Sequence, residues 1–201
     1  MIERSVHSTD ESNPLKKGEK TSDKLIWHSF KEGNRKAFQF IYDQNFEILL
    51  QYGLKIVPDQ SFVEDQIQDF FIYLWKKKEN LEIKKSITIY LIWSLRNRII
   101  KAIKSEKMMT SDDGLGIIPE NSDSEDRLTP DELKSAVDSL PVKQREAIYL
   151  KYYQNLDGEE ISNIMDITLG TTYNLLSRAL FNLRKHLPNL SLALLTLRLL
   201  D

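Results

Sequence analysis

The chain has 201 residues, of which 41% are hydrophobic and 29% charged, as is ordinary for a folded globular protein. It contains no cysteine, which excludes disulfides and thiolate metal sites. No apolar run approaches the ~20 residues that span a bilayer, and the N-terminus lacks the apolar segment of a signal peptide. We therefore expect a cytoplasmic protein without membrane insertion.

The net charge of −2 hides an uneven distribution of charge along the chain. Residues 20–104 carry 15 Lys and Arg against 10 Asp and Glu, a net charge of +5. Residues 106–130 carry 2 against 7, a net charge of −5, and residues 131–189 carry 7 against 8, a net charge of −1. The N-terminal half is therefore the predicted electrostatic anchor for any nucleic acid.

The first half of the chain predicts a helical domain. Residues 1–22 are polar without an apolar period, so we expect a disordered leader there. Helical periodicity begins near Asp23 and is broken at Gly33-Asn34, and a second helix follows from Ala37. Residues 23–107 are predicted to form this first domain.

Ser61 is placed to cap a helix that runs to about Lys77, and this helix mixes acids, amides and aromatic residues on one face. Aromatic side chains beside amides and carboxylates suit a protein interface. The competing interpretation is an ordinary core helix whose acids are solvated, and composition alone favours it. The stripe consists of Glu64, Gln68, Phe71 and Trp75, with Asp65 beside it.

The helix expected from Ser86 to about Lys107 is basic in its second half and carries aromatic residues in its first. Tyr90 and Trp93 precede four cations, Arg96, Arg98, Lys101 and Lys104. Phosphates attract cations and unstacked bases pack on aromatic faces, so this helix suits single-stranded or distorted DNA. A solvated charged surface is the competing interpretation.

Residues 108–128 are acidic and rich in Ser, Asp and Gly, which predicts a flexible linker. A second helical domain is expected over residues 129–188, beginning with Pro at its first turn. Residues 189–201 form a leucine-rich tail too short to span a bilayer. The predicted fold class is thus all-α, with two small helical domains joined by an acidic linker.

The strongest local pattern lies between Asp157 and Leu187. Asp157 and Glu160 have the spacing of a capping box, and Thr168 is placed to cap a longer helix after a tight break. The two helices have the form of a helix-turn-helix, although an αα-hairpin in any bundle has the same shape. The outer face of the second helix would carry Thr171, Tyr173, Asn174, Ser177 and Arg178.

The order of these segments resembles the bacterial extracytoplasmic-function sigma factors. The segment from Glu64 to Trp75 is similar to the family's polymerase-docking helix, and the segment from Tyr90 to Asn97 to the helix that leads to its promoter-melting surface. Leu140-Pro141 with Arg145-Glu146, and then residues 156–184, follow the family's C-terminal helix-turn-helix in order. Tyr173 and Leu175 stand where basic residues are common in the family.

The resemblance implies binding to core RNA polymerase and to promoter DNA, and it implies an anti-sigma protein as a further partner. Polymerase binding is expected at Glu64, Asp65, Gln68, Phe71 and Trp75. Contact with the −10 region is expected at Arg96, Asn97, Arg98, Lys101 and Lys104. Contact with the −35 region is expected at Thr171, Tyr173, Asn174, Ser177 and Arg178.

Two other classes of function compete with this one. A stand-alone transcriptional regulator could use the N-terminal helices for dimerisation or effector binding. An enzyme is disfavoured because His7, His28 and His186 are scattered and no Gly-rich phosphate loop follows a strand. We therefore expect no catalytic residue, no metal, no cofactor and no small-molecule substrate.

Overall fold

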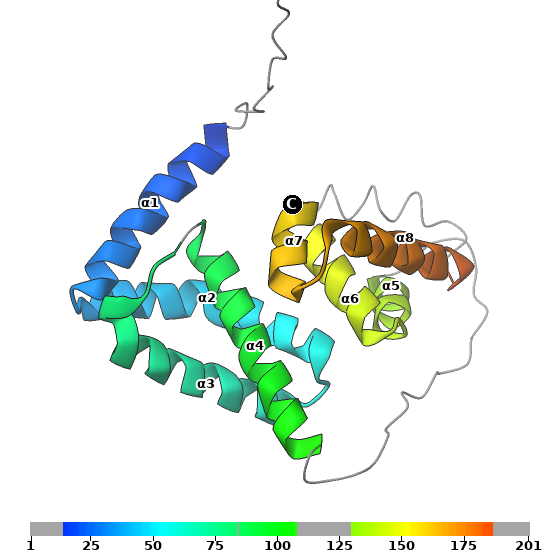
Figure 1. The fold of residues 1–201 in the computed structure, drawn as a ribbon, viewed down its shortest axis with the longest axis horizontal. Coiled ribbons are helices and arrows are strands. Elements are labelled where there is room, and N and C mark those ends of the chain that lie inside the picture. The colour runs from blue at the N-terminus through cyan, green and yellow to red at the C-terminus, as the bar shows by residue number, and fades with distance from the viewer. Residues whose placement is uncertain (1–13, 84, 108–129, 187–201) are drawn as a thin grey trace, which may run out of the picture.

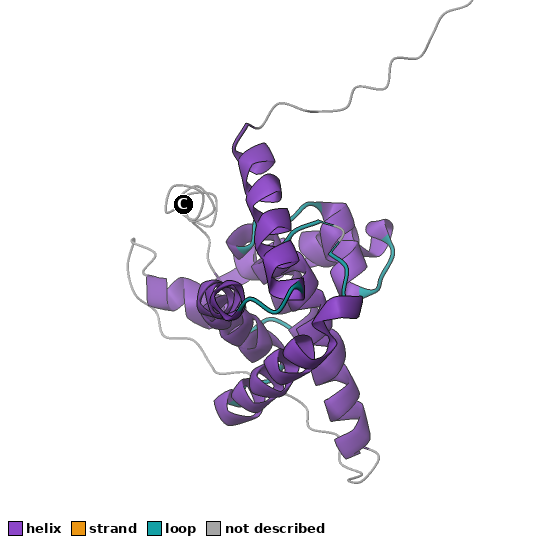
Figure 2. Ribbon diagram, turned by 90° about the vertical axis from the view of Figure 1, so that its left-hand side faces the viewer, coloured by secondary structure: helices purple, strands orange, loops and turns teal. Residues whose placement is uncertain are grey.

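The computed structural model describes residues 14–83, 85–107 and 130–186, and this part of the chain is helical without a strand (Figures 1 and 2). The predicted all-α fold class is confirmed. The predicted linker (residues 108–128) and the leucine-rich tail (residues 189–201) lie outside the described residues. The helices form an N-terminal bundle (α1–α4) and a C-terminal bundle (α5–α8). Their bounds are α1 Pro14–Lys31, α2 Arg35–Ile56, α3 Gln60–Lys77, η1 Lys78–Asn80, α4 Ile87–Lys107, α5 Pro130–Asp138, α6 Val142–Ile148, η2 Tyr149–Tyr153, α7 Gly158–Met165 and α8 Leu169–His186.

Helix α1 begins at Pro14, inside the segment predicted to be a disordered leader. Residues 14–22 are therefore a correction to that prediction, while residues 1–13 lie outside the described part. A proline fits the first turn of a helix because its missing N–H would have no intrahelical partner there. A helix that projects away from the bundle needs no apolar period, so the polar sequence of this segment did not indicate a helix (Figure 1).

The break between α1 and α2 follows from two residues. Gly33 has a φ of +88°, which glycine adopts without steric cost, and its N–H donates to the carbonyl of Phe30. Asn34 then caps α2, because its side chain accepts from the backbone N–H groups of Lys36 and Ala37. Helix α3 is capped by Asp59 rather than by Ser61, the residue expected from the sequence. Asp and Ser are both favoured as N-cap residues, so the local sequence does not determine which of Asp59 and Ser61 caps the helix.

The N-terminal bundle has an aromatic core. Trp27 and Phe30 of α1 are buried and their rings lie 5.0 Å apart, while Phe71 of α3 stacks edge-on against Tyr42 of α2 at 4.8 Å. Helices α2 and α3 cross closely at Gly53, where a Cβ atom would meet Val63 at 2.4 Å. The buried stripe of α4 consists of Ile87, Leu91, Ile92, Leu95 and Ile99.

The C-terminal bundle contains the predicted helix-turn-helix. Asp157 and Glu160 form both halves of a capping box at the start of α7, as predicted. Asp166 ends α7 with a φ of +53°, and the hydroxyl of Thr168 accepts from the N–H of Thr171 at 3.2 Å, the predicted cap of α8. The buried stripe of α8 consists of Thr172, Leu176, Ala179 and Leu183.

The two bundles are packed against one another. Helix α2 contacts α6, and α4 contacts α7, so the predicted basic helix lies directly beside the helix-turn-helix (Figure 1). None of the helices in the described part of the chain is long and apolar enough to cross a membrane.

Candidate functional site

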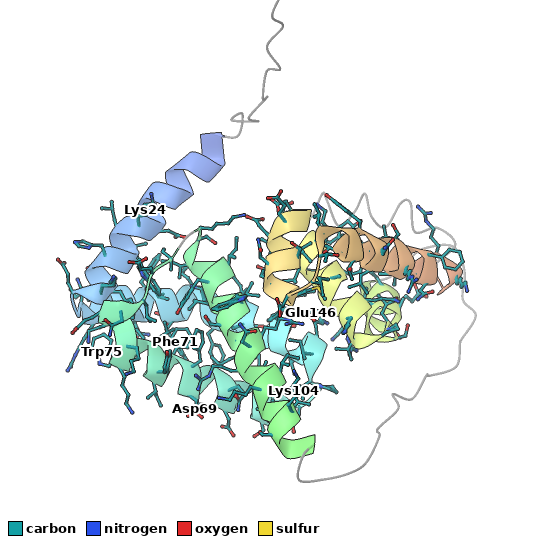
Figure 3. All side chains as sticks on the ribbon, in the orientation of Figure 1. Lys24, Asp69, Phe71, Trp75, Lys104 and Glu146 are labelled. Carbon is teal, nitrogen blue, oxygen red and sulfur yellow. The ribbon has the colours of Figure 1, made fainter. Side chains whose placement is uncertain are left out.

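A groove of about 400 Å³ runs between α2 and α3 of the N-terminal bundle. Its floor is aromatic: the Phe38 and Trp75 rings lie 5.0 Å apart, and the Phe71 ring lies edge-on to both Phe38 and Tyr42. Figure 3 shows Phe71 and Trp75 at this end of the bundle. The lining residues are Phe38, Tyr42, Gln68, Phe71, Ile72, Trp75 and Lys76. An apolar groove with one amide and one cation at its edge suits a protein partner.

The structure brings three of the five predicted polymerase-binding residues into this groove. They are Gln68, Phe71 and Trp75. Asp65 is exposed on the same helix, one turn before Gln68, and Glu64 accepts a hydrogen bond from Gln60 at 2.7 Å. Phe71 is only 3% exposed, so it is as much a core residue as a groove residue.

The sequence did not predict that α2 contributes to the groove, or that Ile72 and Lys76 of α3 do. Phe38 and Tyr42 of α2 are partly exposed, and both line the groove. Ile72 was not singled out, although it is 53% exposed and lies in the groove. The signal for this groove in the sequence is Ile72, an apolar residue outside the buried stripe of α3, because an exposed apolar side chain there indicates a second apolar face.

The five predicted −10 residues on α4 divide into three environments. Asn97, Lys101 and Lys104 are exposed. The guanidinium of Arg98 lies over the rings of Phe70 and Tyr73, at 5.9 and 5.6 Å, as a cation–π contact. Its Nε is buried and has no hydrogen-bond partner among the described residues.

Arg96 is in the third environment, at the contact between the bundles. Its Nε donates to Glu146 of α6 at 2.6 Å, and the same carboxylate oxygen accepts from the hydroxyl of Tyr52 at 2.7 Å. Glu146 is 2% exposed and the Arg96 side chain 11%. Burial and the Glu146 charge raise the pKa of Tyr52 well above its usual value, so its hydroxyl is a donor at neutral pH. Arg96 is thus not open to solvent like Lys101.

The predicted −35 residues all lie on the exposed side of α8, near its N-terminus. They are Thr171, Tyr173, Asn174, Ser177 and Arg178. Tyr173 is 56% exposed, yet its hydroxyl also lies close to the start of α7. A Cβ atom on Gly158 would come within 2.9 Å of that hydroxyl, so glycine allows the two helices of the motif to approach.

The described residues were also compared with the pattern of a metal site. No group of three His, Asp or Glu side chains in that part of the chain is placed to bind a metal ion. The features that the fold gathers are an apolar groove, an exposed basic helix and an exposed polar helix face.

Comparison with known families assigns both bundles. Residues 41–108 match the family described as Sigma-70 region 2, and residues 131–183 match the family described as Sigma-70, region 4. The first segment contains α4 and every groove residue except Phe38, and the second contains α7 and all but the last turn of α8. Together they cover more than half of the chain.

Two curated relatives align with most of the chain at low identity. The chain is 27% identical over 163 residues to the ECF RNA polymerase sigma factor SigL of Mycobacterium tuberculosis, covering 75% of this chain and 88% of the relative. It is 26% identical over 176 residues to the ECF RNA polymerase sigma factor SigW of Bacillus subtilis, covering 80% and 94%.

Two solved structures share the fold. One is the sigma factor RpoE in complex with the anti-sigma factor NepR from Bartonella quintana, with a TM-score of 0.61 and 21% identity, covering 77% of this chain and 98% of that one. The other is CnrH in complex with the cytosolic domain of CnrY, with a TM-score of 0.59 and 16% identity, covering 83% and 97%. With both regions matched in order, the chain belongs to the ECF-type sigma factors, which direct transcription initiation by RNA polymerase.

Proposed function

We propose that each of the three surfaces described above binds a different partner of this sigma factor. The groove between α2 and α3 docks core RNA polymerase, the exposed side of α4 engages the −10 element, and the outer face of α8 reads the −35 element. The observation that carries this proposal is the groove itself, because it gathers Gln68, Phe71 and Trp75 from the predicted docking segment. The three surfaces belong to different helices.

Polymerase docking at the groove rests on burial of apolar area around a few polar anchors. Ile72 and Trp75 offer apolar surface to a partner, and Gln68 offers an amide with two donors and an acceptor. Such a mixture resembles the centre of a protein interface, where a few residues supply most of the binding free energy. Asp65, exposed one turn away, extends the surface with a charge that can select a basic partner.

Binding of the −10 element would combine phosphate contacts with stacking. Lys101 and Lys104 are exposed cations that can neutralise phosphates, and Asn97 lies on the same helix. Tyr73 and Trp93 are 42% and 45% exposed, and aromatic faces bind unpaired bases. Arg98 lies over Tyr73 and places a positive charge beside that face.

Recognition of the −35 element would depend on geometry more than on charge. Of the five outer-face residues of α8, only Arg178 is cationic. Asn174 has the donor and acceptor needed to pair with an adenine edge in the major groove, and Arg178 can reach guanine or a phosphate. Binding by the N-terminal bundle and polymerase would raise the local concentration of this helix at the promoter.

We infer two further properties from the family. One structural relative, RpoE, is a sigma factor bound to the anti-sigma factor NepR, so an anti-sigma protein is a proposed partner of this chain as well. A protein whose partners are polymerase and promoter DNA is expected to work in the cytoplasm, as a binding protein without catalysis of its own.

The test of this function is run-off transcription with core polymerase on a library of promoters. We expect promoter-specific transcripts only when the chain and core polymerase are both present. A stand-alone regulator would instead protect an operator from cleavage without polymerase. Specific footprints by the protein alone, with no transcripts, would reject the sigma-factor roles proposed for the three surfaces.

A further inference from the structure

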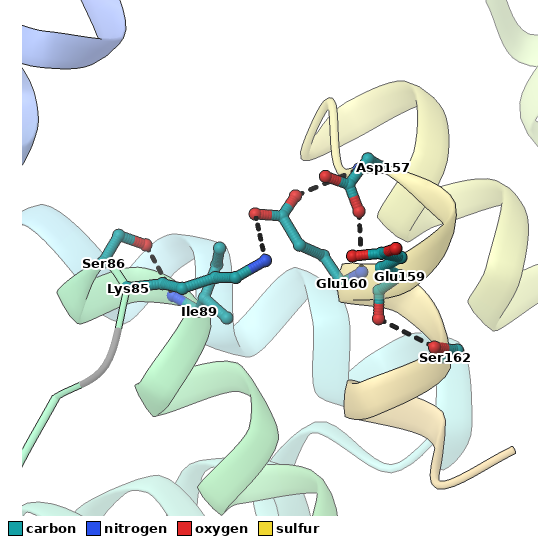
Figure 4. A network of polar contacts seen from close by, with 7 residues as sticks. All are labelled: Lys85, Ser86, Ile89, Asp157, Glu159, Glu160 and Ser162. Carbon is teal, nitrogen blue, oxygen red and sulfur yellow. Dashed lines mark hydrogen bonds and ion pairs between the residues drawn. The ribbon is translucent and has the colours of Figure 1, made fainter. Parts of the chain in front are cut away.

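The N-terminus of α4 is capped in part by another helix. Asp23 of α1 accepts a hydrogen bond from the N–H of Ile87 at 2.9 Å, although the two residues are 64 positions apart. The Ser86 hydroxyl accepts from the N–H of Ile89 at 3.2 Å (Figure 4). The first N–H groups of a helix have no intrahelical partner, and side chains of this kind satisfy them. The cap therefore also fixes α1 against the start of α4.

An aromatic contact extends this junction between α1 and α4. The indole N–H of Trp27 donates to the carbonyl of Leu81 at 3.4 Å, and the Trp27 ring lies edge-on to that of Tyr90 at 5.5 Å. The Tyr90 ring in turn lies 6.5 Å from that of Trp93, which is 45% exposed. The exposed face of α4 thus begins where α1 contacts this helix.

That face of α4 continues from the junction to the other end of the helix. Its members recur every three or four residues, as they do on one face of a helix: Tyr90, Trp93, Asn97, Lys101 and Lys104. The last three are the exposed residues proposed above to engage the −10 element. DNA that follows this face toward the start of α4 arrives at α1.

The side of α1 that contacts α4 is cationic where the helix projects from the bundle. Lys16 and Lys20 precede Asp23 by seven and three residues, a spacing that places all three on one face. Lys24, one turn after Lys20, is exposed (Figure 3). The whole of α1 carries five lysines against two acids, and Asp23, one of these acids, is engaged at α4.

We propose that Lys16, Lys20 and Lys24, the lysine face of α1, bind phosphates of promoter DNA beyond the part that α4 holds. These lysines are about 6 Å apart along the helix axis. One strand of B-DNA carries a phosphate about every 3.4 Å, so neighbouring lysines can contact the same strand. The inference rests on the −10 role proposed for α4, because that role brings DNA to the junction.

The junction makes these contacts less costly. A segment that is ordered only on binding loses conformational entropy, whereas a segment already held in place loses less. The contacts of Asp23 and Trp27 set the direction of α1 before DNA arrives. Asp23 is thus a positioning residue for the lysine face. Phosphate contacts add affinity at any sequence, so the lysine face contributes no selectivity for bases.

The first experiment measures promoter binding by the holoenzyme at several salt concentrations. The double variant Lys16→Gln with Lys20→Gln should reduce the slope of log affinity against log salt by about 1 to 2, equally on all sequences. Arginine at the same two positions keeps the charges and should keep the slope. Lys36→Gln, at an exposed position of α2, is the matched control. An unchanged slope in the glutamine double variant, or an equal loss in Lys36→Gln, would overturn the proposal.

The second experiment locates the DNA beside α1. The sequence has no cysteine, so Ser22→Cys, at an exposed position of α1, gives a unique site for a tethered iron chelate that cleaves nearby DNA. We expect cuts next to the −10 element in the complex of holoenzyme and promoter. The same label in the glutamine double variant should give weaker cuts. DNA left uncut by the label on an otherwise wild-type chain would contradict the proposal.

Two variants of Asp23 test its positioning role. Asp23→Ala removes the acceptor for the N–H of Ile87, so it should reduce both the affinity for promoter DNA and the salt slope. Asp23→Asn keeps an acceptor, and asparagine is as good a cap as aspartate, so it should restore the slope. Circular dichroism checks that both variants are folded. Equal slopes in the two variants would reject the positioning role.

Other outcomes assign the lysine face or the proposed function differently. If the face binds an acidic surface of polymerase, the glutamine double variant will lose affinity for core enzyme without DNA and keep its salt slope, which overturns the proposal. Lower slopes in Lys101→Ala and Lys104→Ala, with no change in the α1 variant, would reject the lysine face alone. A wild-type chain that supports no transcription with core polymerase would instead reject the proposed function.

Discussion

The two bundles differ in core composition, in surface and in net charge. The N-terminal bundle has an aromatic core, an apolar groove and a net positive charge, so it can bind a protein and phosphates with its own surface. The C-terminal bundle has a mainly aliphatic core and a slightly acidic sequence, and Arg178 is the one cation among the five predicted contact residues of α8. The first bundle is equipped for affinity and the second for shape and selectivity.

This difference explains why the two units are useful in one chain. Non-specific attraction to DNA comes from net positive charge. The C-terminal bundle lacks it, because residues 131–189 carry 7 Lys and Arg against 8 Asp and Glu. Tethering to a bundle with its own affinity raises the effective concentration of the weaker one. The same charge difference lets the two bundles bind each other, as the pair Arg96 and Glu146 shows.

The largest expected effect concerns the aromatic core. Phe71→Ala removes a ring that is 3% exposed, and the free energy of unfolding should fall by about 3–5 kcal/mol. Ile72→Ala is the matched control, because Ile72 lines the same groove but is 53% exposed, and its effect on stability should stay within about 0.5 kcal/mol. Urea unfolding followed by circular dichroism measures both. Equal losses would mean that the groove is not distinct from the core.

The next effect concerns polymerase binding at the groove. Gln68→Ala and Ile72→Ala should weaken binding to core polymerase about tenfold or more each, at unchanged stability, as interface residues do when truncated. Asp65→Ala should act in the same direction. Titration of core enzyme with labelled protein gives the affinities, and Asp43→Ala, on an exposed part of α2 outside the groove, is the control. Wild-type affinity in both Gln68→Ala and Asp65→Ala would place the docking surface elsewhere.

A smaller effect should distinguish α4, the basic helix, from α8. Lys101→Ala and Lys104→Ala should each reduce the slope of log affinity against log salt by about 1, equally for all DNA sequences. Salt titrations of promoter binding by the holoenzyme measure the slope. Lys134→Ala, which removes an exposed cation from α5, is the control and should leave it unchanged. An unchanged slope in both α4 variants would make Lys101 and Lys104 ordinary solvated charges.

Arg178 tests whether α8 recognises bases, in contrast to the phosphate contacts expected of α4. Arg178→Ala should lower transcription that depends on the −35 element, with a loss of about 1–3 kcal/mol in discrimination if the guanidinium contacts a base. Promoters with and without a −35 element, transcribed by the same holoenzyme, measure this difference. A uniform loss on both promoter types would assign Arg178 to a phosphate or to folding.

The smallest effect is expected at Tyr173. Tyr173→Lys adds a cation at the outer face of α8 and should strengthen DNA binding modestly and steepen its salt dependence by about 1. Part of the gain is offset because the hydroxyl of Tyr173 packs near Gly158. Tyr173→Phe, which keeps the ring and adds no charge, is the control. Tight sequence-specific binding by the wild-type chain at physiological salt without polymerase would break the comparison and favour a stand-alone regulator.

The sequence by itself determined the local elements of this protein. The breaks at Gly33-Asn34 and Asp166, the capping box of Asp157 and Glu160, and the cap at Thr168 are confirmed. These features depend on residues within one or two helical turns, so the local sequence is enough to predict them. The all-α fold class and the sigma-factor resemblance followed from the order of such elements.

Only the tertiary structure decided which predicted site residues are available. Arg96, Lys101 and Lys104 read alike in the sequence, as cations on one helix, but Arg96 is sealed against a glutamate that lies 50 positions further along the chain. The groove likewise required α2 and α3 to meet, because Phe38 and Tyr42 contribute to it from a different helix. Helical periodicity reports the faces of one helix and says nothing of what another helix brings to them, and burial by a distant partner is what separates a free cation from a paired one.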